Sequence, residues 1–207
     1  LFCGFLLSIM GSIVMHQDYF EYDVIVVGGG HSGSEAAAAA ANMGADTLLI
    51  TMKLADIGQM SCNPAIGGIG KGHIAREIDA LGGIMGKATD RAGIQFRMLN
   101  KSKGPAVWGP RAQCGRRAYA RAIRQELEAI DNLKMRSDMV KEILTDDAGE
   151  TVTGVRTNLG KEFCAPCVIL TTGTFSNGVI HVGEQNFGGG RIGESASHGI
   201  TGCLHDL

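Results

Sequence analysis

Four glycines stand close together in the stretch DVIVVGGGHSGSEAAAAAANMG at residues 23–44. Gly28, Gly30 and Gly33 have the G-x-G-x-x-G spacing, which lets backbone N–H groups approach a pyrophosphate at a helix N-terminus. The apolar run 23–27 before them predicts a buried strand, and the alanine-rich run after Gly33 predicts a helix that ends at a further glycine. A glycine turn between a strand and a helix favours a dinucleotide site over an empty turn.

The next strand leaves the identity of the dinucleotide open. Residues 47–50 read TLLI and predict a second strand, which ends at Thr51. Folds that bind NAD usually place an acidic residue at this point, where it accepts a hydrogen bond from a ribose hydroxyl. Because Thr51 carries no charge, both NAD and FAD are compatible with the pattern.

A second glycine-rich stretch, GQMSCNPAIGGIGKGH, contains Cys62. It is not the phosphate loop of nucleotide triphosphatases, because Ala65 takes the first glycine position and Gly72 stands where Ser or Thr should bind magnesium. Cys62 lies among small and polar residues, and neighbouring backbone N–H groups favour a thiolate. We interpret Cys62 as a candidate catalytic residue, and a buried, inert thiol is the alternative.

Residues 97–124 contain eight basic residues and no acidic residue, in a chain whose net charge is -2. This local excess of positive charge suits an anionic polymer or the phosphates of a cofactor, and Trp108 could stack on a base. A solvated helix face is the alternative. The basic residues are Arg97, Lys101, Lys103, Arg111, Arg116, Arg117, Arg121 and Arg124.

The remaining cysteines give no site. Cys164 and Cys167 have the spacing of a redox pair, but they run into a predicted strand and not into a helix N-terminus. Zinc would need two more ligands, and Cys203 and His205 are too distant in sequence to form a standard motif. We therefore predict packing cysteines and no metal site. Six scattered cysteines also favour free thiols and a cytoplasmic location.

The elements that position these motifs follow from the apolar pattern. Strand, glycine turn, helix and strand form one βαβ unit, which predicts a parallel sheet. The glycine-rich segment 58–72 predicts irregular structure. The later part of the chain predicts a helix from Lys71 with Ile74, Ile78 and Leu81 on one face, a helix over 115–130 with Tyr119, Ile123, Leu127 and Ile130 on one face, a β-meander over 139–167, and a return strand VILTTG at 168–173.

Composition sets the limits of the fold. A chain of 207 residues that is 44% hydrophobic and 19% charged can bury a core. Residues 1–14 are apolar, but they have no basic residue before the apolar run and are shorter than the ~20 residues that span a bilayer. We expect these residues to be upstream translation, with a membrane anchor as the alternative. Residues 1–22 are predicted to form an extension outside the folded domain.

Five motifs in this order resemble the MnmG (GidA) family, the flavoprotein subunit of tRNA wobble-uridine modification. The resemblance covers residue 23 to about residue 205. It has two departures, Trp108 where an arginine is common and Gly115 where an aspartate is usual. Family proteins are some three times longer, so the resemblance implies an N-terminal fragment. The motifs are GGGHSGSEAA, GQMSCNPAIGGIGKGH, AGIQFRMLNKSKGPAV, PRAQ and TTGTF.

The resemblance implies an α/β fold in which 23–175 form a Rossmann-like FAD-binding domain with a parallel sheet and a β-meander. Residues 176–207 would begin an inserted second domain. Cys62 matches a family cysteine with a redox or catalytic role, and the segment TTGTF at 171–175 matches the one that closes such domains. The residues implied to bind FAD are Gly28, Gly29, Gly30, His31, Ser32, Gly33, Val140 and Ser197.

The resemblance also implies an activity and its partners. The family adds an aminomethyl or carboxymethylaminomethyl group to C5 of the wobble uridine in tRNA, with NADH as reductant. It acts together with the GTPase MnmE, which binds a C-terminal region absent from this chain, and the full-length protein is expected to form a homodimer. The alternatives are another FAD-dependent oxidoreductase and a non-catalytic, RNA-binding fragment that keeps the nucleotide fold.

Overall fold

The computed structural model describes residues 21–206. The predicted extension 1–22 therefore lies almost entirely outside the described residues. Its last residue, Tyr22, is buried and packs against Phe163, with ring centroids 6.5 Å apart. Among residues 21–206, no helix is both long enough and apolar enough to cross a membrane.

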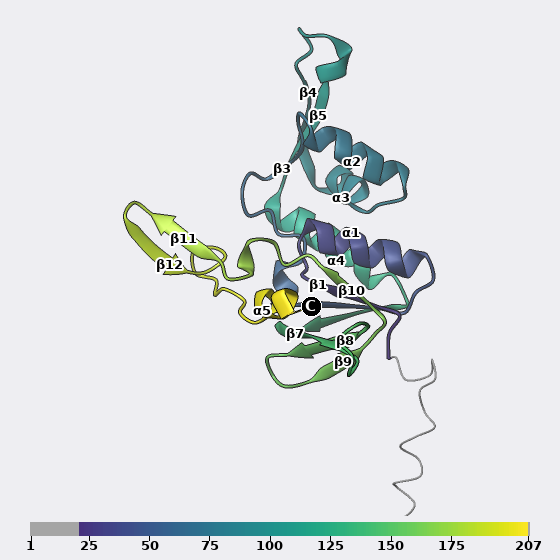
Figure 1. The fold of residues 1–207 in the computed structure, drawn as a ribbon. Helices are drawn as coiled ribbons and strands as arrows, with labels where there is room; N and C mark the ends of the chain where they lie inside the picture. Colours follow the sequence, from purple (N-terminus) through teal and green to yellow (C-terminus); the bar gives the residue numbers. More distant parts are fainter. Residues whose placement is uncertain (1–20, 207) are drawn as a thin grey trace, which may run out of the picture.

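A four-stranded parallel sheet forms the centre of the fold, as the βαβ unit predicts (Figure 1). The strand order is β10-β1-β2-β6, and every neighbouring pair is parallel. Helix α1 crosses from β1 to β2. The bounds are β1 Val24–Val27, α1 His31–Asn42, β2 Thr47–Thr51, β6 Leu133–Ser137 and β10 Cys167–Leu170.

Both faces of this sheet are covered, which explains why β1 and β2 are apolar without alternation. On one face, Val26 and Leu49 pack in a core with the alanines of α1 and with helix α4 (Arg116–Glu128). On the other face, Ile25 and Leu48 pack against the meander. The predicted helix over 115–130 is confirmed as α4, whose Tyr119, Ile123 and Leu127 are buried.

The predicted meander is confirmed as the antiparallel sheet β7-β8-β9. Its strands are β7 (Val140–Thr145), β8 (Val152–Thr157) and β9 (Glu162–Cys164). The third strand is shorter than predicted, because Cys167 already belongs to β10 in the parallel sheet. The two cysteines of CAPC therefore lie in different sheets, and both thiols are free.

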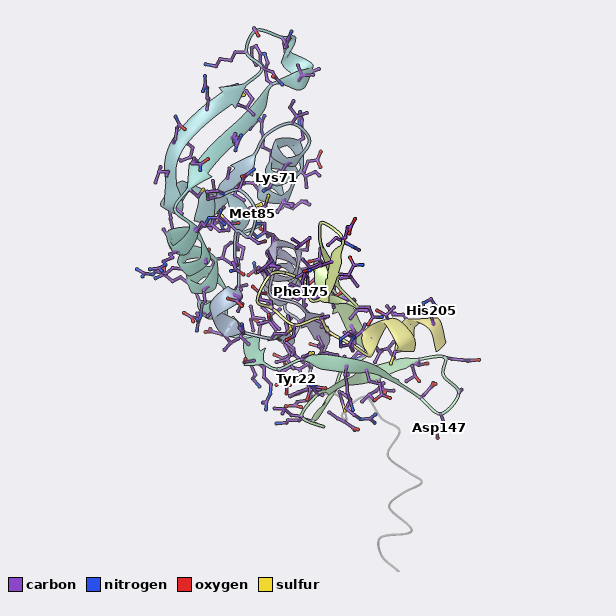
Figure 2. The ribbon with its side chains drawn as sticks, turned by 90° about the vertical axis from the view of Figure 1, so that its left-hand side faces the viewer. Tyr22, Lys71, Met85, Asp147, Phe175 and His205 are labelled. Atoms are coloured by element: carbon purple, nitrogen blue, oxygen red, sulfur yellow. The ribbon has the colours of Figure 1, made fainter. Side chains whose placement is uncertain are left out.

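A second lobe projects beyond α1 and is built on the antiparallel sheet β3-β5-β4 (Figures 1 and 2). In Figure 2, Lys71 of α2 and Met85 of α3 lie beside the long β4–β5 ribbon. The lobe comprises β3 Ala65–Gly67, α2 Lys71–Ala80, α3 Met85–Ala92, β4 Gly93–Leu99 and β5 Gly109–Cys114.

Two expectations for this lobe are wrong. The segment 58–72 is not wholly irregular, because β3 pairs with β5, and a strand of three residues is too short to show an apolar pattern. The helix predicted from Lys71 is confirmed as α2, which begins at that residue. The predicted apolar face of α2 is not a core face in the described part of the chain, since Ile74 is 58% exposed and Leu81 is 89% exposed. Helix packing here relies instead on small residues, among them Ala75 and Ala88.

A polar side chain also joins the lobe to α1, the helix that follows the glycine turn, beside the core that the two parts share. The carboxylate of Glu35 on α1 accepts hydrogen bonds from the backbone N–H groups of Met85 (2.6 Å) and Ile84 (3.1 Å). These groups lie at the N-terminus of α3, where a carboxylate also interacts favourably with the helix dipole. Glu35 therefore fixes α3 relative to α1.

The last part of the chain forms a hairpin and then a helix that packs near the meander. The hairpin of β11 (Val179–Val182) and β12 (Gln185–Gly188) projects from the body, and α5 (Ile200–Asp206) packs near β7 (Figure 1). Ile200 is buried in the same core as Ile25. The part of the chain that the structure describes also contains three short 3-10 turns, η3 (Leu54–Asp56), η4 (Pro105–Val107) and η5 (Gly173–Phe175).

Candidate functional site

The three motif glycines differ in what the structure requires of them. Gly28 has a φ of +109°, and a Cβ at this position would lie 2.5 Å from the carbonyl oxygen of Thr171. A Cβ on Gly33 would overlap the carbonyl oxygen of Gly28. In contrast, a Cβ on Gly30 would meet nothing within 4 Å. The fold itself requires glycine at 28 and 33, whereas the space beside Gly30 is open to a ligand.

The N-terminus of α1 presents free donors to that space. The first hydrogen bond of the helix runs from the N–H of Ser34 to the carbonyl oxygen of Gly30, at 2.9 Å. The N–H groups of His31, Ser32 and Gly33 precede it and have no partner of this kind within the helix. Together with the positive end of the helix dipole, they favour a bound anion such as a phosphate.

Thr171 holds the turn in place from β10. Its hydroxyl donates to the carbonyl oxygens of Val27 (2.9 Å) and Gly28 (3.1 Å), and its backbone N–H also donates to Val27 (2.8 Å). Thr171, the first residue of TTGTF, therefore ties the end of β10 to the glycine turn.

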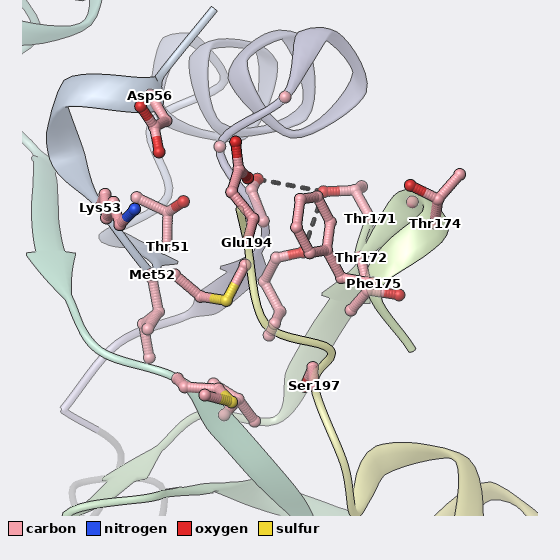
Figure 3. Close-up of a pocket in the computed structure, with 18 of the residues that line it drawn as sticks. Thr51, Met52, Lys53, Asp56, Thr171, Thr172, Thr174, Phe175, Glu194 and Ser197 are labelled. Carbon is pink, nitrogen blue, oxygen red and sulfur yellow. Dashed lines mark hydrogen bonds between the residues drawn. The ribbon is translucent and has the colours of Figure 1, made fainter. Parts of the chain in front are cut away.

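A cavity of about 300 Å³ opens at this end of the sheet (Figure 3). It is lined by the glycine turn, the end of β2, the start of β7 and the segments 171–175 and 191–200. Of the residues predicted to bind a cofactor, Gly28, Gly29, Gly30, Val140 and Ser197 line it. Segments far apart in the sequence therefore meet at the carboxyl ends of parallel strands, where α/β sheets bind ligands.

The predicted residue His31 lies differently. It is not among the residues that line the cavity, and its ring packs edge-on against Tyr119 of α4, with centroids 5.6 Å apart. Its Nδ1 and the Tyr119 hydroxyl are buried and have no hydrogen-bond partner among the described residues. Burial, followed by the positive charges of Lys71 and Arg191, lowers the pKa of His31. Ser32 and Gly33 also lie outside the lining.

The structure adds Asp138, which the sequence did not indicate. Asp138 is 8% exposed and lines the cavity. Its Oδ1 accepts a hydrogen bond from the N–H of Met139 at 2.8 Å, but Oδ2 has no partner within residues 21–206. The Asp138 N–H donates to the carbonyl oxygen of Thr51 at 2.9 Å. A buried carboxylate oxygen thus lies beside the strand end where a nucleotide fold usually supplies an acidic residue.

Cys62 lies in an exposed loop that is anchored from two sides. Arg116, at the start of α4, donates through Nη2 to the carbonyl oxygen of Cys62 at 2.6 Å and through Nη1 to that of Met60. Arg191 donates to the Gln59 side chain at 2.6 Å. The alternative of a buried thiol is wrong, since Cys62 is exposed.

The basic run does not form one free surface. Arg116 is used to anchor the Cys62 loop, and Arg124 pairs with Glu128 at 3.0 Å on the same helix. The other six make no ion pair within the described residues. Among those residues there is also no cluster of three or more His, Cys, Asp or Glu side chains that could hold a metal.

The family model for glucose inhibited division protein A (GIDA) matches residues 23–207. The chain belongs to this family. The tRNA uridine 5-carboxymethylaminomethyl modification enzyme MnmG of Salinibacter ruber is 98% identical over 193 residues, which cover 93% of this chain and 29% of that protein. The enzyme of the same name from Flavobacterium johnsoniae is 60% identical over 181 residues, 87% of this chain and 29% of that protein.

A solved structure of a GIDA family protein supports the fold. Aquifex aeolicus GidA has a TM-score of 0.85 and 51% sequence identity, over 90% of this chain and 30% of that one. The α/β fold with a Rossmann-like parallel sheet is therefore confirmed. This chain spans 29% of the length of both curated relatives.

The lowered pKa of His31 makes a prediction about stability. In the unfolded chain, His31 takes up a proton near its ordinary pKa of 6.5, whereas in the folded chain burial lowers this pKa. The buried, neutral His31 therefore makes its full contribution to the free energy of unfolding above about pH 7, and this contribution is lost as the pH falls below about 6.5. The His31→Gln variant should lack this loss, so its unfolding free energy should fall less than that of wild type between pH 7 and pH 5. Urea unfolding measures it.

The control for this measurement is His73→Gln, because His73 is an exposed histidine on α2. The profile of that variant is the reference for the loss of a histidine that is not buried. Parallel profiles for wild type and His31→Gln would show that the burial of His31 does not affect its protonation.

Proposed function

We propose that this chain is the FAD-binding part of a tRNA-modifying enzyme of the MnmG type. The whole enzyme would add an aminomethyl or carboxymethylaminomethyl group to C5 of the wobble uridine. The observation that carries the proposal is the open space beside Gly30, at a helix N-terminus whose first N–H groups have no partner within the helix. This space lies at the edge of a cavity that contains a carboxylate oxygen without a hydrogen-bond partner in residues 21–206. Bound FAD supplies the redox chemistry of such an enzyme.

The residues present fit a dinucleotide cofactor. The N–H groups at the start of α1 would bind the pyrophosphate, and the close packing of Gly28 and Gly33 keeps them in position. Asp138 Oδ2 would accept a hydrogen bond from a hydroxyl or amino group of the nucleotide. This bond would give the buried oxygen the partner that it lacks within residues 21–206. Val140 and Ser197, which are both buried, would form the wall of the cavity.

Cys62 is the proposed catalytic residue. A thiol acts as a nucleophile toward the uridine or exchanges electrons with the flavin, and both roles need an accessible sulfur. Cys62 is exposed, while Arg116 donates to its carbonyl oxygen and to that of Met60. Such an anchor leaves the side chain free and limits the movement of the loop.

The remaining parts of the proposal concern the whole protein. NADH would reduce the flavin, MnmE would be the GTPase partner, and the protein would act as a homodimer in the cytoplasm. We also propose that residues 23–175 form the FAD-binding domain and that 176–207 begin a second domain. Purification with MnmE and size-exclusion chromatography would test the partner and the dimer.

Gly30→Val tests the cofactor site, because the protein leaves room for the side chain and the pyrophosphate would not. We expect the variant to fold with wild-type circular dichroism and to lose its flavin absorbance. The matched control is Gly104→Val, since a Cβ at Gly104 also meets nothing within 4 Å and the position lies far from the cavity. Flavin at wild-type stoichiometry in Gly30→Val would refute the site.

Asp138→Asn tests the carboxylate. The amide oxygen of Asn can keep the hydrogen bond to the N–H of Met139, so the melting temperature without FAD should change little. A hydrogen bond to a charged group contributes about 1.5–3 kcal/mol, so FAD affinity should fall roughly ten- to a hundredfold. Titration of the apoprotein with FAD measures this. An unchanged affinity would mean that Asp138 serves only the turn before β7.

Cys62→Ser tests the catalytic residue in the whole protein. Because Cys62 is exposed, flavin content and melting temperature should stay at wild-type levels. Modification of the wobble uridine, measured in a digest of tRNA, should be almost abolished, since a serine hydroxyl is hardly ionised near neutral pH. Cys167→Ser is the control, because that exposed cysteine lies outside the loop. Normal modification by the Cys62→Ser variant would mean that Cys62 has only a structural role.

A further inference from the structure

A turn over residues 191–194 borders the cavity beside Gly30. Arg191 and Glu194 are bridge partners in this turn, and the N–H of Glu194 donates to the carbonyl oxygen of Arg191 at 3.0 Å. The Thr174 hydroxyl donates to the carbonyl oxygen of Gly190 at 3.1 Å, so the chain before the turn is held against the segment that follows β10. The main chain of Arg191 is therefore fixed beside the cavity.

The guanidinium group of Arg191 has three neighbours. Its Cζ lies 5.0 Å from the centroid of the Phe175 ring, a distance at which a cation is attracted to an aromatic face. Its Nη1 lies 3.7 Å from Glu194 Oε2 and donates to Gln59 Oε1 at 2.6 Å. All four residues line the cavity, and Figure 3 shows Phe175 and Glu194 there. The bond to Gln59 therefore joins two segments of the cavity lining that are 132 residues apart in the sequence.

The ends of the loop 59–64 are held to the fold by main-chain hydrogen bonds. The N–H of Gly58 donates to the carbonyl oxygen of Gly29 at 3.0 Å, and the N–H of Cys114 donates to that of Pro64 at 2.7 Å. Because the two ends are fixed in this way, the course of the loop between them depends on its contacts with side chains.

Two arginines hold this loop between its ends, and they come from different elements. Arg116 of α4 donates to the carbonyl oxygen of Cys62 at 2.6 Å, and Arg191 holds the Gln59 side chain. Gln59 and Ser61 line the cavity, whereas Cys62 is exposed. The bond from Arg191 therefore fixes the residues before Cys62 along the wall of the cavity.

A ligand in the cavity would strengthen this bond. The Arg191 side chain is 31% exposed, so water competes for its donors. A bound ligand excludes that water, and a hydrogen bond from a charged group is stronger where the local dielectric is low. The loop would then be held most firmly when the cavity is occupied.

We propose that Arg191 is a positioning residue that acts through Gln59 and holds Cys62 in a fixed relation to the ligand of the cavity. This inference rests on the proposed function, which makes Cys62 catalytic and FAD the ligand. It adds a residue to that site and makes the position of the thiol depend on the cofactor, because the loop is held more firmly with FAD bound than without it.

Gln59→Leu in the whole protein tests the proposal, because it removes the acceptor and leaves every charge in place. The kcat for modification of the wobble uridine should fall about tenfold or more, since a small displacement of a reacting group slows a reaction severely. KM for tRNA and flavin content at saturating FAD should stay at wild-type values. Gln59→Glu keeps an acceptor oxygen for Arg191 and should restore kcat.

The matched control is Gln125→Leu, the same change at an exposed glutamine on α4, which should keep the wild-type kcat. A double-mutant cycle then isolates the bond. Arg191→Met should lower kcat at least as much as Gln59→Leu, and the double variant should be no slower than Arg191→Met, because both changes break the same contact. Additive losses, or a wild-type kcat in Gln59→Leu, overturn the proposal.

Labelling of Cys62 by a bulky maleimide tests the same contact without catalysis. Such a reagent needs clearance around the thiol, so a loosely held loop reacts faster. Saturating FAD should slow the labelling of Cys62 in the wild type, relative to the exposed Cys167 of the same sample, and Gln59→Leu should lose most of this slowing. An equal effect of FAD in both proteins would mean that the ligand covers the thiol directly, and it overturns the proposal, as does labelling of the wild type that FAD does not change.

The outcomes separate this inference from the proposed function. A folded whole protein that takes up no flavin contradicts the proposed function, and normal modification by Cys62→Ser contradicts the proposed catalytic residue. A wild-type kcat in Gln59→Leu, in an enzyme that Cys62→Ser inactivates, contradicts only the positioning role of Arg191.

Discussion

The close approach of main chains at the glycine turn is the constraint on which the rest of the site depends. Gly28 and Gly33 leave no room for a side chain, and Thr171 ties the turn to β10 with two hydroxyl hydrogen bonds. This packing fixes the start of α1, and through Glu35 it fixes the start of α3 as well. One tight turn therefore orients both the cavity beside Gly30 and the projecting lobe.

The parallel sheet supplies the second condition. Its central strands β1 and β2 are buried on both faces, by α1 and α4 on one side and by the meander on the other, so these strands are accessible mainly at their ends. The cavity forms at the carboxyl ends because every parallel strand ends at the same edge. The Cys62 loop lies between α4 and the segment around Arg191, and both anchor it through arginine hydrogen bonds.

The sequence predicted the elements whose signals are local. The apolar runs of β1 and β2, the alanines of α1 and the buried face of α4 follow directly from periodicity. It missed β6, because LKMRS lies at the sheet edge and carries two basic residues, and Asp138, which follows β6, was missed with it. The apolar residues of α2 indicated a core face, but burial depends on tertiary neighbours that periodicity does not specify.

The basic run over 97–124 shows that a sequence reveals where positive charges gather but not what each side chain contacts. Arg116 and Arg97 belong to the same basic run, yet Arg116 binds two carbonyl oxygens of the Cys62 loop and Arg97 faces a like charge on the neighbouring strand. A guanidinium that satisfies backbone carbonyls stabilises a loop, since it pairs acceptors that have no other partner. A guanidinium directly opposite another on a neighbouring strand costs stability, because like charges repel. The same residue type therefore makes different contacts in the two places, and the difference is set by the strand register and the helix start, which only the folded chain defines.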